Sequence, residues 1–310
     1  MPPALPAPLG QRYAVGGHHL HALVTGSGGP AVVFEAGGAS WSLDWHRVQT
    51  AVAAFTQTVS YDRAGFGWSD PGPRPRTAAQ IAAELHTLLR QAQVPPPYVL
   101  VGASFGGHVV RLLARAHPGE VAGLVLLDPR PEALNAHMPP GWKRQEAAGK
   151  GMYQVLLAAA RLGVLPLLGK LLGGGEAAAP GVAHLPPDLQ ATYLAVGFQA
   201  AYFRANLDEL AASAESDRQV AADPGLGALP LTVLRHGLPD LFARLPAAQQ
   251  APAEQAWQAL QAELAARSTA GALQVAERSG HAIQLHQPDR AVQAIRQMVE
   301  QVRAPAAAAP

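Results

Sequence analysis

Short apolar runs alternate along the chain with longer segments in which apolar residues recur every three or four positions. Such runs are typical of buried strands, and the longer periodicity is typical of helices that cover a sheet. We predict a hairpin over residues 12–25 and buried strands over 30–36, 58–61, 98–101, 121–127, 229–235 and 272–276. Helices are predicted over 42–55, 77–93, 253–267 and 288–302. Strands that alternate with helices predict an α/β fold with a mostly parallel sheet.

The alternation stops after residue 130 and resumes near residue 226. In between, apolar helical segments are separated by paired prolines and by the glycine run 173–175. This change predicts a helical cap, residues 131–225, inserted into a core formed by residues 1–130 and 226–303. The glycine run would permit the cap to move. Residues 304–310 are low in complexity, and we expect a disordered tail there.

The composition of the 310-residue chain narrows the classes of function. A formal net charge of +1 gives no electrostatic basis for binding nucleic acid or an anionic membrane. Cysteine is absent, which excludes disulfides and thiolate metal sites. The most apolar segment, residues 152–172, contains Arg161 and Pro166, and residues 1–10 lack the features of a secretory signal. We therefore expect a cytoplasmic protein with no integral membrane segment.

One Gly-x-Ser-x-Gly sequence, from Gly102 to Gly106, stands between a predicted strand and a predicted helix. A tight turn between two such elements strains the backbone of its central residue, and side chains two positions away would collide with the neighbouring strand and helix. The strain exposes the Ser104 hydroxyl at the N-terminus of the helix. Ser104 is therefore a candidate nucleophile, whereas the same turn without catalytic partners would hold an ordinary serine.

Other candidate site residues also follow predicted strands, namely Gly37 and Gly38, Asp128, Asp240 and His281. In a parallel sheet the C-terminal strand ends line one edge, so we expect these residues to lie near Ser104. A serine hydroxyl needs a base such as histidine, and the histidine needs a carboxylate that fixes its tautomer. The backbone N–H groups of Phe105 and Gly38 are placed to bind the oxyanion of a tetrahedral intermediate.

These pieces resemble the α/β-hydrolase superfamily, in the branch that carries a helical cap. The resemblance extends from about residue 12 to residue 303. It rests on the glycine loop 34–38, the loop 62–69, the serine turn, residues 237–240 and residues 279–281. The order serine, acid, histidine along the chain also matches. The resemblance implies the α/β-hydrolase fold, with Ser104 as nucleophile and His281 as its base, and it implies no metal and no organic cofactor.

The chain departs from the family's usual pattern at two positions. Ala36 stands where the glycine loop often has histidine, and Ala103 stands where histidine often precedes the nucleophile. Because the oxyanion donors are backbone groups, neither change removes the chemistry. Two residues stay open as the triad acid. Asp240 resembles the family's usual acid after the seventh strand, and Asp128 resembles the acid that a subset carries after the sixth; we favour Asp240.

The resemblance implies a serine hydrolase that cleaves a carboxylic ester or related acyl compound, with a small acyl molecule as its partner. Aminopeptidase, C–C bond hydrolase, perhydrolase and acyltransferase reactions share the triad and stay as alternatives, as does a non-catalytic scaffold that binds a small ligand. Haloalkane dehalogenases and epoxide hydrolases of this fold use aspartate at the position of Ser104, so the serine disfavours those reactions. Asp62 and Arg63 could contact substrate, but we expect them to fix their own loop by hydrogen bonds.

Overall fold

The structure is a computed structural model, and it describes residues 5–165, 181–222 and 225–304. Its centre is an eight-stranded sheet in the order β1-β2-β4-β3-β5-β6-β7-β8. The strands are β1 (Gln11–Ala14), β2 (His19–Thr25), β3 (Ala31–Glu35), β4 (Thr58–Tyr61), β5 (Tyr98–Ala103), β6 (Val121–Leu127), β7 (Leu231–His236) and β8 (Gly271–Ala276). β2 pairs antiparallel with β1 and β4, and the remaining pairs are parallel. The prediction of a mostly parallel α/β sheet is confirmed.

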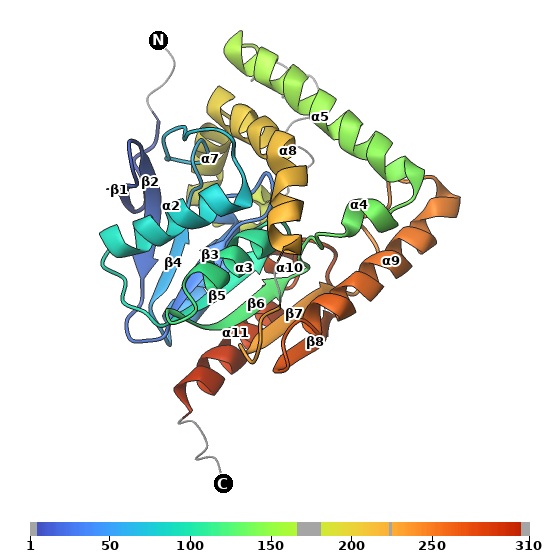
Figure 1. The fold of residues 1–310 in the computed structure, drawn as a ribbon. Coiled ribbons are helices and arrows are strands. Elements are labelled where there is room, and N and C mark those ends of the chain that lie inside the picture. Colours follow the sequence, from blue (N-terminus) through green and yellow to red (C-terminus); the bar gives the residue numbers. More distant parts are fainter. Residues whose placement is uncertain (1–4, 166–180, 223–224, 305–310) are drawn as a thin grey trace.

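Helices cover both faces of this sheet (Figure 1). α2 (Ala78–Gln91) and α3 (Gly106–Ala116) pack on one face, and α1 (His46–Ala53) and α11 (Pro288–Arg303) pack on the other. Strand β5 shows how the sequence supports two cores. Tyr98 and Leu100 belong to the first core, whereas Val99 and Val101 belong to the second, because successive strand side chains face opposite sides. An unbroken apolar run is therefore required in a strand that is buried on both faces.

Two predicted helices differ from the observed ones in their bounds. The segment predicted as one helix over 42–55 is divided into the 3₁₀ helix η1 (Ser42–Trp45) and α1. α9 (Ala247–Ala265) begins before the predicted residue 253 and contains Pro252 in its interior, where the missing N–H removes one intrahelical hydrogen bond. The short helix α10 (Ile283–His286) precedes α11.

The described elements between β6 and β7 are all helical. They are α4 (Leu134–His137), α5 (Pro140–Arg161), η2 (Val182–His184), α7 (Pro187–Gly197) and α8 (Ala200–Ala221). α5 packs along α8 and projects away from the sheet (Figure 1). Residues of η2, α7 and α8 form an apolar cluster with Trp41, Phe66 and Trp68 of the core. The glycine run 173–175 and residues 305–310 of the expected tail lie outside the described residues.

Across the described ranges, no helix combines the length and the apolar character that a membrane span requires.

Candidate active site

Ser104 stands at the turn between β5 and α3. Its φ of 48° lies in the left-handed region, which a serine rarely adopts. The backbone holds this conformation, because the amide of Ser104 donates to the carbonyl of Leu127 and its carbonyl accepts from the amides of Gly107 and Arg130, all at 3.0 Å. The side chain is thereby fixed at the C-terminal edge of the sheet, where it is partly exposed.

The two glycines of the turn are required by close packing. A Cβ atom on Gly106 would lie 2.5 Å from the carbonyl oxygen of Glu35, and one on Gly102 would lie 2.7 Å from the carbonyl oxygen of Gly106. Both contacts are with backbone atoms, which cannot move aside cheaply. Any side chain at these two positions would therefore collide with the backbone, as the sequence pattern predicts.

His281 follows β8 and reaches the serine. Its Nε2 lies 3.0 Å from the Oγ of Ser104, and its Nδ1 lies 2.6 Å from the Oδ2 of Asp128. A carboxylate at Nδ1 favours the tautomer with its proton on that nitrogen, which leaves Nε2 as an acceptor for the hydroxyl proton. The imidazole is 27% exposed, so it borders the space from which a substrate would enter.

Asp128, rather than the favoured Asp240, meets the ring of His281. Asp128 follows β6, which pairs with β5, and its backbone φ of 41° turns the buried carboxylate toward the serine turn. Asp240 lies in the loop after β7 against Gly280, and its Oδ1 accepts the backbone N–H of His281 at 2.9 Å. Of the two open candidates, Asp128 therefore lies at the imidazole of His281, and the favoured Asp240 lies at its backbone.

The Asp128 carboxylate has further partners that sequence reasoning did not identify. Its Oδ2 also lies 2.6 Å from the Nδ1 of His236, and its Oδ1 accepts from the His236 amide at 3.1 Å and from the Trp257 indole at 3.0 Å. Burial would raise the pKa of Asp128, but the hydrogen bonds from the two histidines hold it well below its usual range.

His236 lies between two carboxylates. Its Nε2 is 3.0 Å from Glu254 of α9, on the side opposite Asp128. Burial would lower the pKa of His236, but hydrogen bonds to both carboxylates and their negative charges raise it to about 10. The atoms of Asp128, His236 and His281 that could ligate a metal ion lie within 4.8 Å of one another. Because both Nδ1 atoms are at hydrogen-bonding distance from the same oxygen, we interpret this group as a hydrogen-bonded cluster and not as a metal centre.

Arg63 holds the glycine loop next to Ser104. Its Nη1 and Nη2 donate to the carbonyls of Ala36 and Gly37 at 2.7 and 2.8 Å. The same guanidinium pairs with the buried Glu35 at 2.9 Å and with Glu209 of α8 at 2.7 Å. A Cβ on Gly37 would lie 3.3 Å from the Cβ of Ser104, so the held loop is in close contact with the serine turn.

Asp62 fixes its own loop, since it accepts the amides of Ser42 and Trp68 at 3.0 and 3.1 Å and contacts His21 at 2.8 Å. The expected hydrogen bonds within this loop are present for Asp62, whereas the guanidinium of Arg63 bonds to the neighbouring glycine loop instead.

The two amides expected to bind an oxyanion are available. Phe105 directly follows Ser104, and Gly38 lies in the held loop; within the described residues neither amide donates a hydrogen bond. The helical segment also contacts this loop, because the Tyr202 hydroxyl of α8 donates to the carbonyl of Ala39 at 2.8 Å. One edge of the sheet thus brings together Ser104, His281, Asp128 and the glycine loop.

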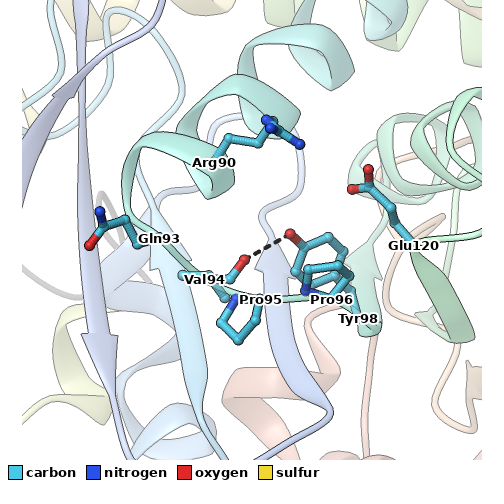
Figure 2. A pocket seen from close by; sticks show the side chains of 7 residues that line it. All are labelled: Arg90, Gln93, Val94, Pro95, Pro96, Tyr98 and Glu120. Atoms are coloured by element: carbon cyan, nitrogen blue, oxygen red, sulfur yellow. Dashed lines mark hydrogen bonds between the residues drawn. The ribbon is translucent and has the colours of Figure 1, made fainter.

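A surface hollow lies at the other end of the sheet. Figure 2 shows it beside the start of β5, where the Tyr98 hydroxyl donates to the Val94 carbonyl at 2.9 Å. Nearby, donor atoms of His86, His117 and Glu120 lie within 4.8 Å of one another. The two imidazole rings are stacked, with centroids 3.6 Å apart and planes 15° apart, so their lone pairs do not converge on one ion. This region is remote from Ser104, which follows the opposite end of β5.

Sequence comparison relates the chain to known proteins. A family model described as the alpha/beta hydrolase fold matches residues 30–176. Lipase LipV of Mycobacterium tuberculosis is 39% identical over 111 residues, which are 36% of this chain and 41% of that protein. The uncharacterized protein YqjL of Bacillus subtilis is 39% identical over 104 residues, or 34% of this chain and 41% of that protein. The matches therefore span less than half the length of these relatives.

Solved structures match over nearly the whole chain. A mutant of a Pseudomonas aeruginosa protein, described provisionally as an epoxide hydrolase, has a TM-score of 0.70 at 20% identity and covers 97% of this chain and 98% of its own. A thermophilic esterase from Thermogutta terrifontis has a TM-score of 0.64 at 20% identity and covers 95% and 100%. At this identity the likeness establishes a shared fold.

Proposed function

Because the chain belongs to the α/β-hydrolase superfamily, we propose that it is a serine hydrolase that cleaves a carboxylic ester or related acyl compound. The observation that supports this most strongly is the unbroken series of hydrogen bonds from Ser104 through His281 to Asp128. Each member supplies what the next requires: a carboxylate orients the imidazole, and the imidazole accepts the hydroxyl proton.

In the proposed first step, the Oγ of Ser104 attacks the substrate carbonyl while Nε2 of His281 takes the hydroxyl proton. Asp128 stabilises the imidazolium that forms. The amides of Phe105 and Gly38 bind the oxyanion, and removal of one such donor typically raises the barrier by about 3–4 kcal/mol. His281 then returns its proton to the leaving alcohol, and the acyl group stays on Ser104.

In the second step, water attacks the acyl-enzyme. His281 accepts a proton from the water and passes it to Ser104 as the acid product leaves. Aminopeptidase, C–C bond hydrolase, perhydrolase and acyltransferase reactions would use the same first nucleophile and differ in the bond broken or in the second acceptor.

We assign residues 131–225 to a cap over this site. Three contacts between α8 and the core support the assignment: Tyr202 with Ala39, Glu209 with Arg63, and Asp217 with His108 at 2.9 Å. The first two reach the glycine loop or the guanidinium that holds it. The aromatic residues of the cap favour a small or medium apolar acyl substrate.

The experiment that tests the proposed function is hydrolysis of a panel of p-nitrophenyl esters by wild type and by Ser104→Ala. We expect wild type to hydrolyse at least one ester and the variant to retain only the background rate. Ser27→Ala is a matched control, because Ser27 is exposed in the turn after β2, at the opposite edge of the sheet. Equal rates in wild type and Ser104→Ala would defeat the proposal.

A further inference from the structure

The carboxylate of Asp128 is shared between two histidines. Its Oδ2 lies 2.6 Å from the Nδ1 of His236 and 2.6 Å from the Nδ1 of His281. A carboxylate oxygen has two lone pairs, so it can accept both N–H groups at once. A catalytic triad needs only one of these donors. The second histidine is buried, and the mechanism proposed above does not use it.

The surroundings of His236 fix its charge. Nδ1 faces Asp128 and Nε2 faces both oxygens of Glu254, at 3.0 and 3.1 Å. A neutral imidazole would direct a lone pair at one of these carboxylates, whereas an imidazolium donates to both. The order of groups is therefore Glu254 carboxylate, His236 imidazolium, Asp128 carboxylate, His281 and Ser104.

We propose that His236 is a positioning residue that stays protonated and, through the carboxylate it shares with His281, keeps His281 neutral and able to act as a base in mildly acidic solution. This inference rests on the proposed function, because it concerns the proposed catalytic base. Two like charges this close disfavour each other, so a fixed imidazolium on one side of Asp128 opposes protonation of the histidine on the other side. The raised pKa of His236 agrees with this arrangement.

Further charged groups bond to the backbone of His236 and His281. Asp240 accepts the backbone amide of His281 at 2.9 Å, and Arg235 donates to the carbonyl of His236 at 2.9 Å. Both hydrogen bonds are with backbone atoms and not with the imidazole rings. Asp128, directly after β6, and Glu254 from α9 lie at hydrogen-bonding distance from the His236 ring, and Trp257 of α9 adds a neutral donor to Asp128. Without the charge of His236, His281 would face carboxylates with no cation between them.

Two substitutions separate the charge of His236 from its hydrogen bond. His236→Asn places an amide N–H near the position of Nδ1, so it can still donate to Asp128 but carries no charge. His236→Lys keeps a positive charge beside the carboxylate. A merely structural role would depend on packing and hydrogen bonding, which the asparagine retains better than the lysine. A charge effect predicts the reverse order.

The test is an NMR titration of the histidine Cε1–H signals in wild type, His236→Asn and His236→Lys, from about pH 5 to about pH 8, the range in which histidine charge normally changes. We expect the His236 signal of wild type not to titrate in this range. We expect the pKa of His281 to rise by about one unit in His236→Asn and to stay near the wild-type value in His236→Lys. An unchanged His281 pKa in His236→Asn would overturn the inference.

This measurement does not depend on catalysis, so failure of the inference and failure of the proposed function are distinguishable. If His236→Asn does not fold, the wild-type titration decides, since an ordinary titration of His236 in that range would also overturn the inference. The pH dependence of the ester hydrolysis rate is the second readout. We expect the acidic limb of this pH profile to move to higher pH in His236→Asn, together with the His281 pKa. In His236→Lys it should return to the wild-type position.

Discussion

Asp240 accepts the backbone N–H of His281 at 2.9 Å and thereby supports the main chain of the histidine whose ring is held by a different carboxylate. The two acidic residues near His281 thus act on different parts of it. Asp128 contacts the imidazole, and Asp240 contacts the main chain of the loop that carries it. This division of roles leads to opposite expectations for two matched substitutions.

Asp128→Asn is expected to lower kcat/KM for an ester by on the order of 10³- to 10⁴-fold, because an amide at Nδ1 favours the wrong tautomer of His281. Asp240→Asn is expected to lower it by less than about 10-fold, since the amide oxygen can still accept the backbone N–H. Steady-state kinetics on both variants measures the difference. A larger loss in Asp240→Asn than in Asp128→Asn would reverse our assignment of the acid.

Gly106→Ala is expected to destabilise the fold by about 1–3 kcal/mol, because its Cβ would overlap the carbonyl oxygens of Glu35 and Ala36 at 2.5 and 2.8 Å. The serine turn would also shift, so ester hydrolysis should fall. Gly119→Ala is the control, since no atom lies within 4 Å of its added Cβ. Urea unfolding measures both changes, and equal stability of the two variants would argue against a tightly packed turn.

Glu35→Gln is expected to change how stability depends on pH. Burial raises the pKa of Glu35 from its ordinary value of 4.5 to about 7, against the opposing effects of Arg63 and Tyr61. The folded protein then binds a proton that the unfolded chain releases. This contribution to stability is fully present below about pH 4.5 and is lost as the pH rises to about 7, by roughly 3 kcal/mol.

Unfolding free energies measured across this range should therefore fall more in wild type than in Glu35→Gln. Glu300→Gln, at an exposed position of α11, should follow the wild-type curve. If Glu35→Gln also followed that curve, Glu35 would titrate alike in the folded and unfolded chain.

Arg63→Met is expected to destabilise the protein by about 3–5 kcal/mol, because it leaves the buried carboxylates of Glu35 and Glu209 without their cation. Arg74→Met is a matched control: Arg74 also pairs with α8, through Asp208, but its side chain is 58% exposed, so a change below about 1 kcal/mol is expected. Urea unfolding compares the two. Ester hydrolysis should also fall in Arg63→Met, because the glycine loop loses both hydrogen bonds from the guanidinium.

Much of the site was predictable because its residues directly follow strands that the sequence identifies. The apolar run before Gly102 identified β5, and the glycine spacing identified the strained serine that follows it. His281 was recognisable from its place after the last strand. These features are local or depend only on strand order, so the sequence displays them directly.

The acid and its supporting residues depend on strand register, which the sequence does not display. The amide of Asp128 bonds to the carbonyl of Leu234, and this parallel pairing brings the end of β7, with His236, beside Asp128. Glu254 and Trp257 then approach from α9. The sequence gives no partner for His236 at the end of its strand, and it favours Asp240 because that residue stands where the family usually has its acid.

Covalent labelling with a fluorophosphonate probe tests most directly whether Ser104 is an activated nucleophile. Wild type, Ser104→Ala, His281→Ala and the control Ser27→Ala would be labelled at neutral pH, and the modified peptide identified by mass spectrometry. We expect rapid labelling of wild type and Ser27→Ala on Ser104, none in Ser104→Ala, and labelling at least about 100-fold slower in His281→Ala. Labelling at the same rate in wild type and His281→Ala, or labelling of a different serine, would contradict the proposed catalytic role of this pair.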